Sequence, residues 1–95
     1  MELDGIKFDS QLEGKYYKHL KLLQKAGEVV FFLRQIPFHL PGNVTYRCDF
    51  QVFYVGGIVE FIDVKGHQTP EFIMKKKQVE ALYPVEIRIV KKGEF

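Results

Sequence analysis

The first strong pattern along the chain is a helical one. Ser10 and Glu13 form the S-x-x-E pattern of a capping box, in which two side chains satisfy free backbone groups at a helix start. Gly27 is a typical stop, because glycine readily adopts the left-handed conformation that ends helices. The pattern predicts a helix that begins at this box and runs to about Lys25. Its core-facing side is formed by Leu12, Tyr16, His19, Leu20 and Leu23.

Three segments rich in β-branched and aromatic residues follow, and each predicts a strand. The first runs from Glu28 to Ile36, the second from Tyr46 to Tyr54, and the third from Ile58 to Lys65. The segment from Pro37 to Asn43 is expected to be a loop, since proline, glycine and asparagine punctuate it. Apolar residues occupy both alternating positions of the second and third strands, so both faces of the sheet should be covered.

The last third of the chain predicts a second helix and a final strand. Residues 69–71, Thr-Pro-Glu, supply an N-cap, a proline at the first helical position and an acid in the first turn. The helix should run to about Ala81. Val85 to Val90 alternates apolar and charged residues, which is typical of a strand. The tail from Lys91 to Phe95 is expected to be frayed.

Composition limits the classes of protein that the sequence can encode. The 95 residues, 46% of them hydrophobic, predict one domain spanning 1–95 with a single core. The net charge of +2 permits binding to nucleic acid but does not require it. The single cysteine, Cys48, excludes an internal disulfide and a cysteine-based zinc site. Without a signal peptide or a membrane-length apolar run, the sequence favours a cytoplasmic location and no membrane partner.

Two acids and a lysine interrupt the apolar strands. Asp49 lies in the second predicted strand, and Asp63 and Lys65 lie two apart in the third. Charges in an apolar strand are unfavourable unless they are paired or bind a ligand. Carboxylates are ligands that Mg²⁺ prefers, and bound Mg²⁺ can activate water and stabilise charge on a phosphate. The pattern therefore indicates metal-assisted phosphodiester cleavage. The other interpretation is an edge strand whose Asp63 and Lys65 face water or pair with each other.

The turn between the second and third strands decides whether these acids can meet. A two-residue turn at Gly56-Gly57 would pair Asp49 with Val64, which places Asp49 and Asp63 on opposite faces. A three-residue loop, Val55-Gly56-Gly57, or a bulge near Asp49 would instead place the two acids opposite each other on one face. The site therefore requires an odd loop or a bulge.

The order Glu13, Asp49, Asp63-x-Lys65 resembles the PD-(D/E)xK nuclease superfamily. Within that superfamily it resembles small phage-encoded nuclease-like proteins of the endonuclease I or junction-resolvase type. The resemblance covers nearly the whole chain in the order of its elements, although Cys48 stands where the motif has proline. It implies a restriction-endonuclease-like α/β (α+β) fold: a mixed four-stranded sheet flanked by helices, in the order α-β-β-β-α-β.

The resemblance also implies roles for individual residues. Asp49 and Asp63 would bind Mg²⁺, for which Mn²⁺ would be able to substitute, and the carbonyl of Val64 would be a further ligand. Lys65 would position the attacking water. Glu13 would complete or support the metal shell from the first helix.

Two of the site residues have a competing structural interpretation. The carboxylate of Glu13 can instead bond the backbone N–H of Ser10 as part of the capping box. Gln35 shares a strand face with Leu33 and Phe31 by the period of two. Gln35 is either an accessory residue that supports a ligand or water, or a polar group at a strand end near the surface.

The second predicted helix carries Lys75, Lys76 and Lys77 in succession. These lysines can steer the backbone phosphates of DNA, which gives affinity independent of sequence. They can also form a solvated helix face. Because consecutive helical positions diverge by about 100°, at least one of the three must point away from DNA.

Together these features predict a Mg²⁺-dependent endodeoxyribonuclease that hydrolyses DNA. The resemblance to phage-encoded nucleases implies branched, recombination or replication DNA of a phage as an attractive substrate, and the cytoplasm of the host cell as the location. The alternatives are a catalytically silent nuclease-like module that binds DNA or protein, and a small structural or interaction protein. Nine Phe and five Tyr, together with apolar residues on both strand faces, leave apolar surface that a two-fold homodimer would bury.

Overall fold

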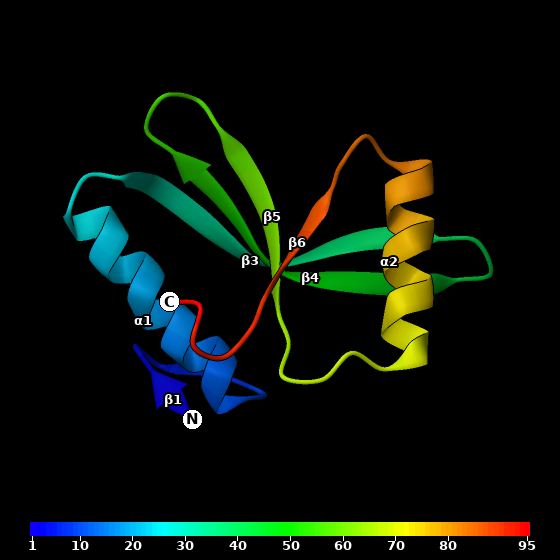
Figure 1. Cartoon of the computed structure of the whole chain (residues 1–95), viewed down its shortest axis with the longest axis horizontal. Helices are drawn as coiled ribbons and strands as arrows, with labels where there is room; N and C mark the ends of the chain where they lie inside the picture. The colour runs from blue at the N-terminus through cyan, green and yellow to red at the C-terminus, as the bar shows by residue number, and fades with distance from the viewer.

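The computed structural model describes all of residues 1–95 and has the predicted class, a mixed four-stranded sheet with two helices (Figure 1). The strands follow chain order across the sheet, and all neighbours are antiparallel except the last pair, which is parallel. That parallel connection passes through a helix, as a crossover requires. The sheet consists of β3 (Val29–Leu40), β4 (Val44–Tyr54), β5 (Val59–Val64) and β6 (Ile87–Val90), and the helices are α1 (Gln11–Lys25) and α2 (Pro70–Leu82).

Both helices begin with the predicted caps. The Ser10 hydroxyl accepts the Glu13 N–H at 3.1 Å, and the Thr69 hydroxyl accepts the Phe72 N–H, also at 3.1 Å. α1 ends before Gly27, which has the left-handed φ of +84° that a helix C-terminus favours. Neither helix has the length and apolar content needed to cross a membrane.

The first long strand extends further than the sequence predicted. β3 continues to Leu40, so the prediction of a loop from Pro37 was wrong, and the turn is confined to residues 41–43. Pro37 lies opposite Arg47 within the β3–β4 ladder. Proline lacks the N–H that a central strand needs, but β3 is an edge of the sheet, where a missing donor is tolerated.

The β4–β5 turn has the three-residue loop that the two acids require. The Tyr54 N–H donates to the Ile58 carbonyl at 2.8 Å, which leaves residues 55–57 between them. Further along, Phe50 lies opposite Ile62, and one step more in this register places Asp49 opposite Asp63. Both glycines of the loop have positive φ, 100° and 93°, which other residues rarely adopt.

The core has two parts, one under each helix. Alternate residues of β4 contribute to both parts. Phe50 and Val52 pack on α1, and Tyr46 and Cys48, earlier in the same strand, pack on α2. Figure 1 shows the two helices at opposite ends of the long β3–β4 hairpin. Asp49 therefore lies where the packing of β4 changes from one helix to the other.

β3 has an irregularity at the same level. Gln35 has a φ of +55°, and the pairs on either side of it, Arg34 with Phe50 and Ile36 with Cys48, place it at the level of Asp49. Phe31 and Leu33 are largely exposed, but the Gln35 side chain reaches Glu13 on α1. The expected alternation is thus interrupted at Gln35, because a left-handed residue redirects the side chains of a strand.

Two terminal segments pack in ways that the sequence analysis did not anticipate. A short hairpin, β1 (Glu2–Leu3) and β2 (Ile6–Lys7), precedes α1 and turns through Asp4-Gly5, both with positive φ. At the other end the tail from Lys91 to Phe95 has no helix or strand and its residues are all exposed. The Phe95 ring nevertheless lies edge-on to Tyr16 of α1, 4.9 Å between centroids, which is an aromatic contact that the sequence analysis did not anticipate.

Candidate active site

Asp63 is the most unusual residue of the structure. It lies in the middle of the sheet on β5, it is completely buried, and neither oxygen of its carboxylate has a hydrogen-bond partner. The ammonium of Lys65 is 3.5 Å from Oδ1, which is longer than a good hydrogen bond. Buried polar groups are nearly always satisfied, so a carboxylate left this way calls for an explanation.

Burial changes the acidity of Asp63. Desolvation raises the pKa of its carboxyl to about 6, and the nearby Lys65 ammonium and the Asp49 backbone only partly oppose this rise. Ionisation of Asp63 is therefore less favourable in the folded protein than in water. A cation at the two free oxygens would remove that penalty, because an opposite charge within bonding distance favours the ionised form.

Asp49 lies beside Asp63 on the neighbouring strand. Its Oδ2 accepts the backbone N–H of Val64 at 2.9 Å, so β5 holds the carboxylate in place. Desolvation by burial raises the pKa of Asp49, and the Val64 N–H, Lys65 and Arg34 lower it. Its other oxygen has no hydrogen bond within the protein, so this oxygen is free to bind a metal ion.

Glu13 is not a simple cap. Its backbone N–H donates a hydrogen bond to the Ser10 hydroxyl. Its carboxylate instead points to β3, where it accepts a hydrogen bond from the Gln35 amide at 3.1 Å and lies 3.6 Å from the Arg34 guanidinium. Burial raises the pKa of Glu13, and the negative charge of Asp49 raises it further. The structural role considered for this carboxylate, a bond to the Ser10 N–H, is not what the structure has.

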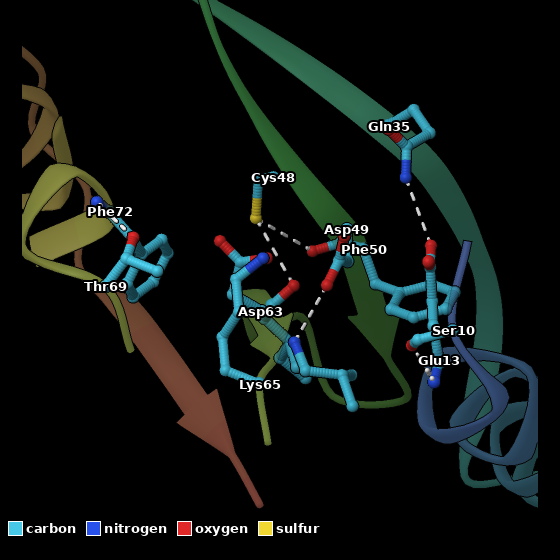
Figure 2. A network of polar contacts seen from close by, with 12 residues as sticks. Ser10, Glu13, Gln35, Cys48, Asp49, Phe50, Asp63, Lys65, Thr69 and Phe72 are labelled. Atoms are coloured by element: carbon cyan, nitrogen blue, oxygen red, sulfur yellow. Dashed lines mark hydrogen bonds and ion pairs between the residues drawn. The ribbon is translucent and has the colours of Figure 1, made fainter. Parts of the chain in front are cut away.

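Asp49 stands between the two halves of the site. Figure 2 shows Asp63 on one side of it and Glu13 with Gln35 on the other. No three histidine, cysteine or acidic side chains in the chain lie close enough together to form a metal-binding group. The structure therefore brings Asp49 and Asp63 together on adjacent strands, and it places Glu13 beside them without completing a cluster of three acids.

Lys65 points from β5 toward α2. Its side chain is about one-third exposed, and its ammonium lies 4.9 Å from the centre of the Phe72 ring. A cation over an aromatic face is held weakly. Lys65 is therefore near Asp63 and also accessible to a ligand from solvent.

The lysines of α2 are less free than their sequence suggests. Lys75 pairs with Glu71 at 2.9 Å and Lys76 pairs with Glu80 at 3.0 Å, each one turn away on the helix. Lys77 is exposed and forms no ion pair. The three residues thus do not form one continuous cationic surface.

The sequence analysis missed two charged residues near the site. Arg34 lies against Glu13 and stacks on Phe8 at 4.5 Å, and its buried Nε has no partner. Asp9, just before α1, contributes to the electrostatic field at both Glu13 and Asp49. Arg34 had the same signal that revealed Asp49, a charge within an apolar strand, whereas nothing in the sequence marks Asp9.

The donor atoms suit a hard divalent cation. Asp49 and Asp63 offer carboxylate oxygens, which Mg²⁺ and Mn²⁺ accept, and no thiolate or imidazole competes. Cys48 is adjacent, but burial raises the pKa of its thiol to about 12, and the thiol donates to the carbonyls of Phe50 and Ile62. The unpaired oxygens of Asp63 are the observation that fits a metal best.

The chain belongs to a defined protein family. The model of the family described as "Protein of unknown function (DUF1064)" matches residues 1–93, which is nearly the whole chain. No curated protein matches the sequence at a significant level. The family carries no assigned chemistry, so any function has to be argued from the site.

The raised pKa of Asp63 predicts how stability depends on pH without metal. Between about pH 4 and pH 6 the folded protein binds more protons than the unfolded chain, so the free energy of unfolding falls as pH rises. Above about pH 6 the contribution of Asp63 lowers the free energy of unfolding by on the order of 3 kcal/mol relative to its value below pH 4. Asp63→Asn, which keeps the shape without the charge, should remove the share of this decline that comes from Asp63 and raise the urea midpoint at neutral pH, while the raised pKa values of Asp49 and Glu13 leave a smaller decline.

Urea unfolding in a metal-free buffer at several pH values measures this effect. Glu86→Gln is the matched control, because Glu86 is an exposed acid and the substitution makes the same change from carboxylate to amide. If Asp63→Asn is less stable than the wild type at neutral pH, Asp63 is satisfied in the folded protein and the account of its burial is wrong.

Proposed function

We propose that the chain is a metal-dependent endodeoxyribonuclease whose ligands are Asp49 and Asp63. The observation that carries the proposal is the fully buried carboxylate of Asp63, whose oxygens accept no hydrogen bond and have only the Lys65 ammonium nearby. The register of the two strands places a second acid, Asp49, opposite it. A protein retains such a destabilising group most readily when it serves a ligand. Asp63 does form an ion pair with Lys65 at 3.5 Å, as the structural alternative expected, but this pair leaves both carboxylate oxygens without a hydrogen bond.

Each residue of the site has a defined task in this proposal. Bound Mg²⁺ would supply the Lewis acid that stabilises charge on a phosphate and acidifies a water. Asp49 and Asp63 hold it through oxygen, and the Val64 peptide, already tied to Asp49, is the place for a carbonyl ligand. Lys65 positions the attacking water or holds a phosphate oxygen, since its ammonium lies beside Asp63 and remains partly exposed.

The residues around Glu13 position its carboxylate and do not bind the metal themselves. Gln35 and Arg34 fix the carboxylate of Glu13 on α1, so its negative charge stays next to Asp49. This field adds to the attraction that Asp49 exerts on a cation. Glu13 is accordingly proposed as a supporting acid, and the accessory role of Gln35 is to hold it.

A cleavage assay tests the function directly. Lys65→Ala should slow Mg²⁺-dependent or Mn²⁺-dependent DNA cleavage by at least about tenfold, as expected for loss of one catalytic group. Asp63→Ala should abolish it, because a metal ligand is lost. The assay uses plasmid, linear duplex and branched DNA, which also reports the preferred substrate, and Lys18→Ala serves as an exposed-lysine control.

Two outcomes would contradict the enzyme assignment. Equal cutting by wild type, Lys65→Ala and Asp63→Ala would place the activity in a contaminant. No cutting of any substrate with either metal, while DNA still binds, would favour the alternative of a catalytically silent nuclease-like module.

Metal binding has its own prediction. Mg²⁺ should raise the melting temperature of the wild type, since a ligand that binds only the folded state stabilises it. The rise should be larger near pH 7.5 than near pH 5, because protons compete for Asp63, whose pKa is about 6. Lys65→Ala should keep the shift and Asp63→Asn should lose it. A shift retained in Asp63→Asn would place the metal elsewhere.

The assembly expected from the sequence also has a candidate surface. Val30, Phe31 and Leu33 on the edge strand β3 are all about half exposed, as are neighbouring apolar residues of the β4–β5 hairpin. An unpaired edge strand readily pairs with another, and antiparallel pairing of two β3 strands generates a closed two-fold dimer. We infer that a second copy covers this surface.

Leu33→Lys should convert the dimer to a monomer without unfolding it, because the side chain is 46% exposed in the single chain. Sedimentation equilibrium at micromolar concentration measures the mass. Wild type at 11.2 kDa rather than twice that value would overturn the dimer.

A further inference from the structure

A narrow groove runs between the first half of β4 and the start of α2. Its volume is about 210 Å³, and its lining contains three cationic residues and one acid: Thr45, Tyr46, Arg47, Lys65, Thr69, Glu71, Phe72 and Lys75. Sites for larger organic ligands usually occupy about 300–1,000 Å³ and have mostly apolar walls. This groove is smaller and mostly polar, so it suits a small polar group rather than an organic cofactor.

The charges in the groove favour an anion. Arg47 is exposed and forms no ion pair. Lys65 is shared with Asp63, and Lys75 is paired with Glu71, whose own side chain is 70% exposed and can move away. The planar guanidinium of arginine can donate two parallel hydrogen bonds to two phosphate oxygens. Arg47 forms no ion pair, so its guanidinium is available for such a contact.

A second observation comes from the wall of the groove. The Tyr46 side chain is 4% exposed, and its hydroxyl has no hydrogen-bond partner. Its ring packs near Phe38 and Phe72, which fix its position. A buried phenol without a partner is destabilising, and a ligand oxygen in the groove would satisfy it.

The groove and the candidate active site are joined by Lys65. This residue lines the groove and lies 3.5 Å from Asp63, so the two sites are adjacent along β5. Figure 2 shows Thr69 and Phe72, at the start of α2, on the side of Asp63 away from Glu13. A DNA strand with one phosphate at Asp49 and Asp63 would therefore run toward the groove.

We propose that this groove binds a phosphate of the DNA strand next to the one that is cut, through Arg47, Lys75 and the Tyr46 hydroxyl. The inference rests on the proposed function for the identity of the ligand, but its test does not depend on cleavage. The binding of a flanking phosphate fixes the register of a strand without reading its sequence.

Binding is measured without metal, in the presence of a chelator, with fluorescent single-stranded and duplex DNA over a range of salt concentrations. Arg47→Ala and Lys75→Ala should each weaken binding and reduce the slope of log affinity against log salt by roughly 0.7 to 0.9, the value for one lost phosphate contact. Lys18→Ala, an exposed lysine of α1, is the control, and Lys77→Ala, on α2 but outside the groove, tests for general attraction to that helix.

Equal effects of Lys77→Ala and Lys75→Ala, with no effect of Arg47→Ala, would overturn the groove and indicate general attraction to α2. A second arm uses inorganic phosphate. If phosphate raises the melting temperature through Arg47 but no oligonucleotide binds there, the ligand is a free phosphate, and the assignment to a DNA strand is wrong.

Tyr46→Phe separates a binding role from a structural one. Removal of an unpaired buried hydroxyl should leave the melting temperature of the free protein unchanged or raise it, and should weaken DNA binding severalfold. A lower melting temperature with unchanged binding would show that the hydroxyl serves the fold, which contradicts its role in the groove.

The design also separates this inference from the proposed nuclease. Loss of affinity in Arg47→Ala together with no cleavage by the wild type would support the groove and reject the enzyme. The opposite result is metal-dependent cleavage by the wild type together with normal DNA affinity in Arg47→Ala, Lys75→Ala and Tyr46→Phe. That result would support the enzyme and reject the groove.

Discussion

The register of β4 against β5 is the constraint on which the rest of the site depends. A loop of three residues, two of them glycines with positive φ, sets that register and places Asp49 directly opposite Asp63. A loop one residue shorter would move the acids to opposite faces of the sheet, because side chains alternate along a strand. The chemistry proposed for this chain is therefore encoded first in a turn, and only then in the acids themselves.

The consequence of that register is a carboxylate in the middle of the sheet that the protein does not satisfy. Asp49 uses one oxygen on the Val64 N–H, and Glu13 is held by Gln35 and Arg34, but Asp63 has only a lysine at 3.5 Å. The hydrophobic parts of the core, packed on α1 and α2, have to offset this penalty. Such an arrangement is typical of sites where stability is lost in exchange for function.

Local signals predicted much of the fold. The two N-caps, the glycine after α1 and the Gly56-Gly57 turn each act over a few residues, so their effects were legible in the sequence. The failures came from long-range contacts. Pro37 is tolerated in a strand because β3 is an edge strand, and the contact of Phe95 with Tyr16 joins residues far apart in the sequence. The Asp4-Gly5 turn was a local signal that went unused.

The candidate site was predictable in part for the same reason. Charges within apolar strands identified Asp49, Asp63 and Lys65. The sequence left open whether the turn has two or three residues, and the structure decides this with the register that places the two acids together. The surroundings were not predictable. The left-handed backbone at Gln35 redirects its side chain to Glu13, and nothing in the sequence marks this. The i,i+4 spacing of Glu71 and Lys75 on the predicted helix, in contrast, is a signal for their ion pair.

The central claim is that Asp63 is a metal ligand, and a crystal structure grown with Mn²⁺ tests it most directly. The anomalous signal of Mn²⁺ locates the ion without reference to activity. The account predicts a peak within bonding distance of carboxylate oxygens of both Asp49 and Asp63, and its loss in crystals of Asp63→Asn. A structure at saturating Mn²⁺ with no peak there, and with Asp63 still buried and unpartnered, would contradict it.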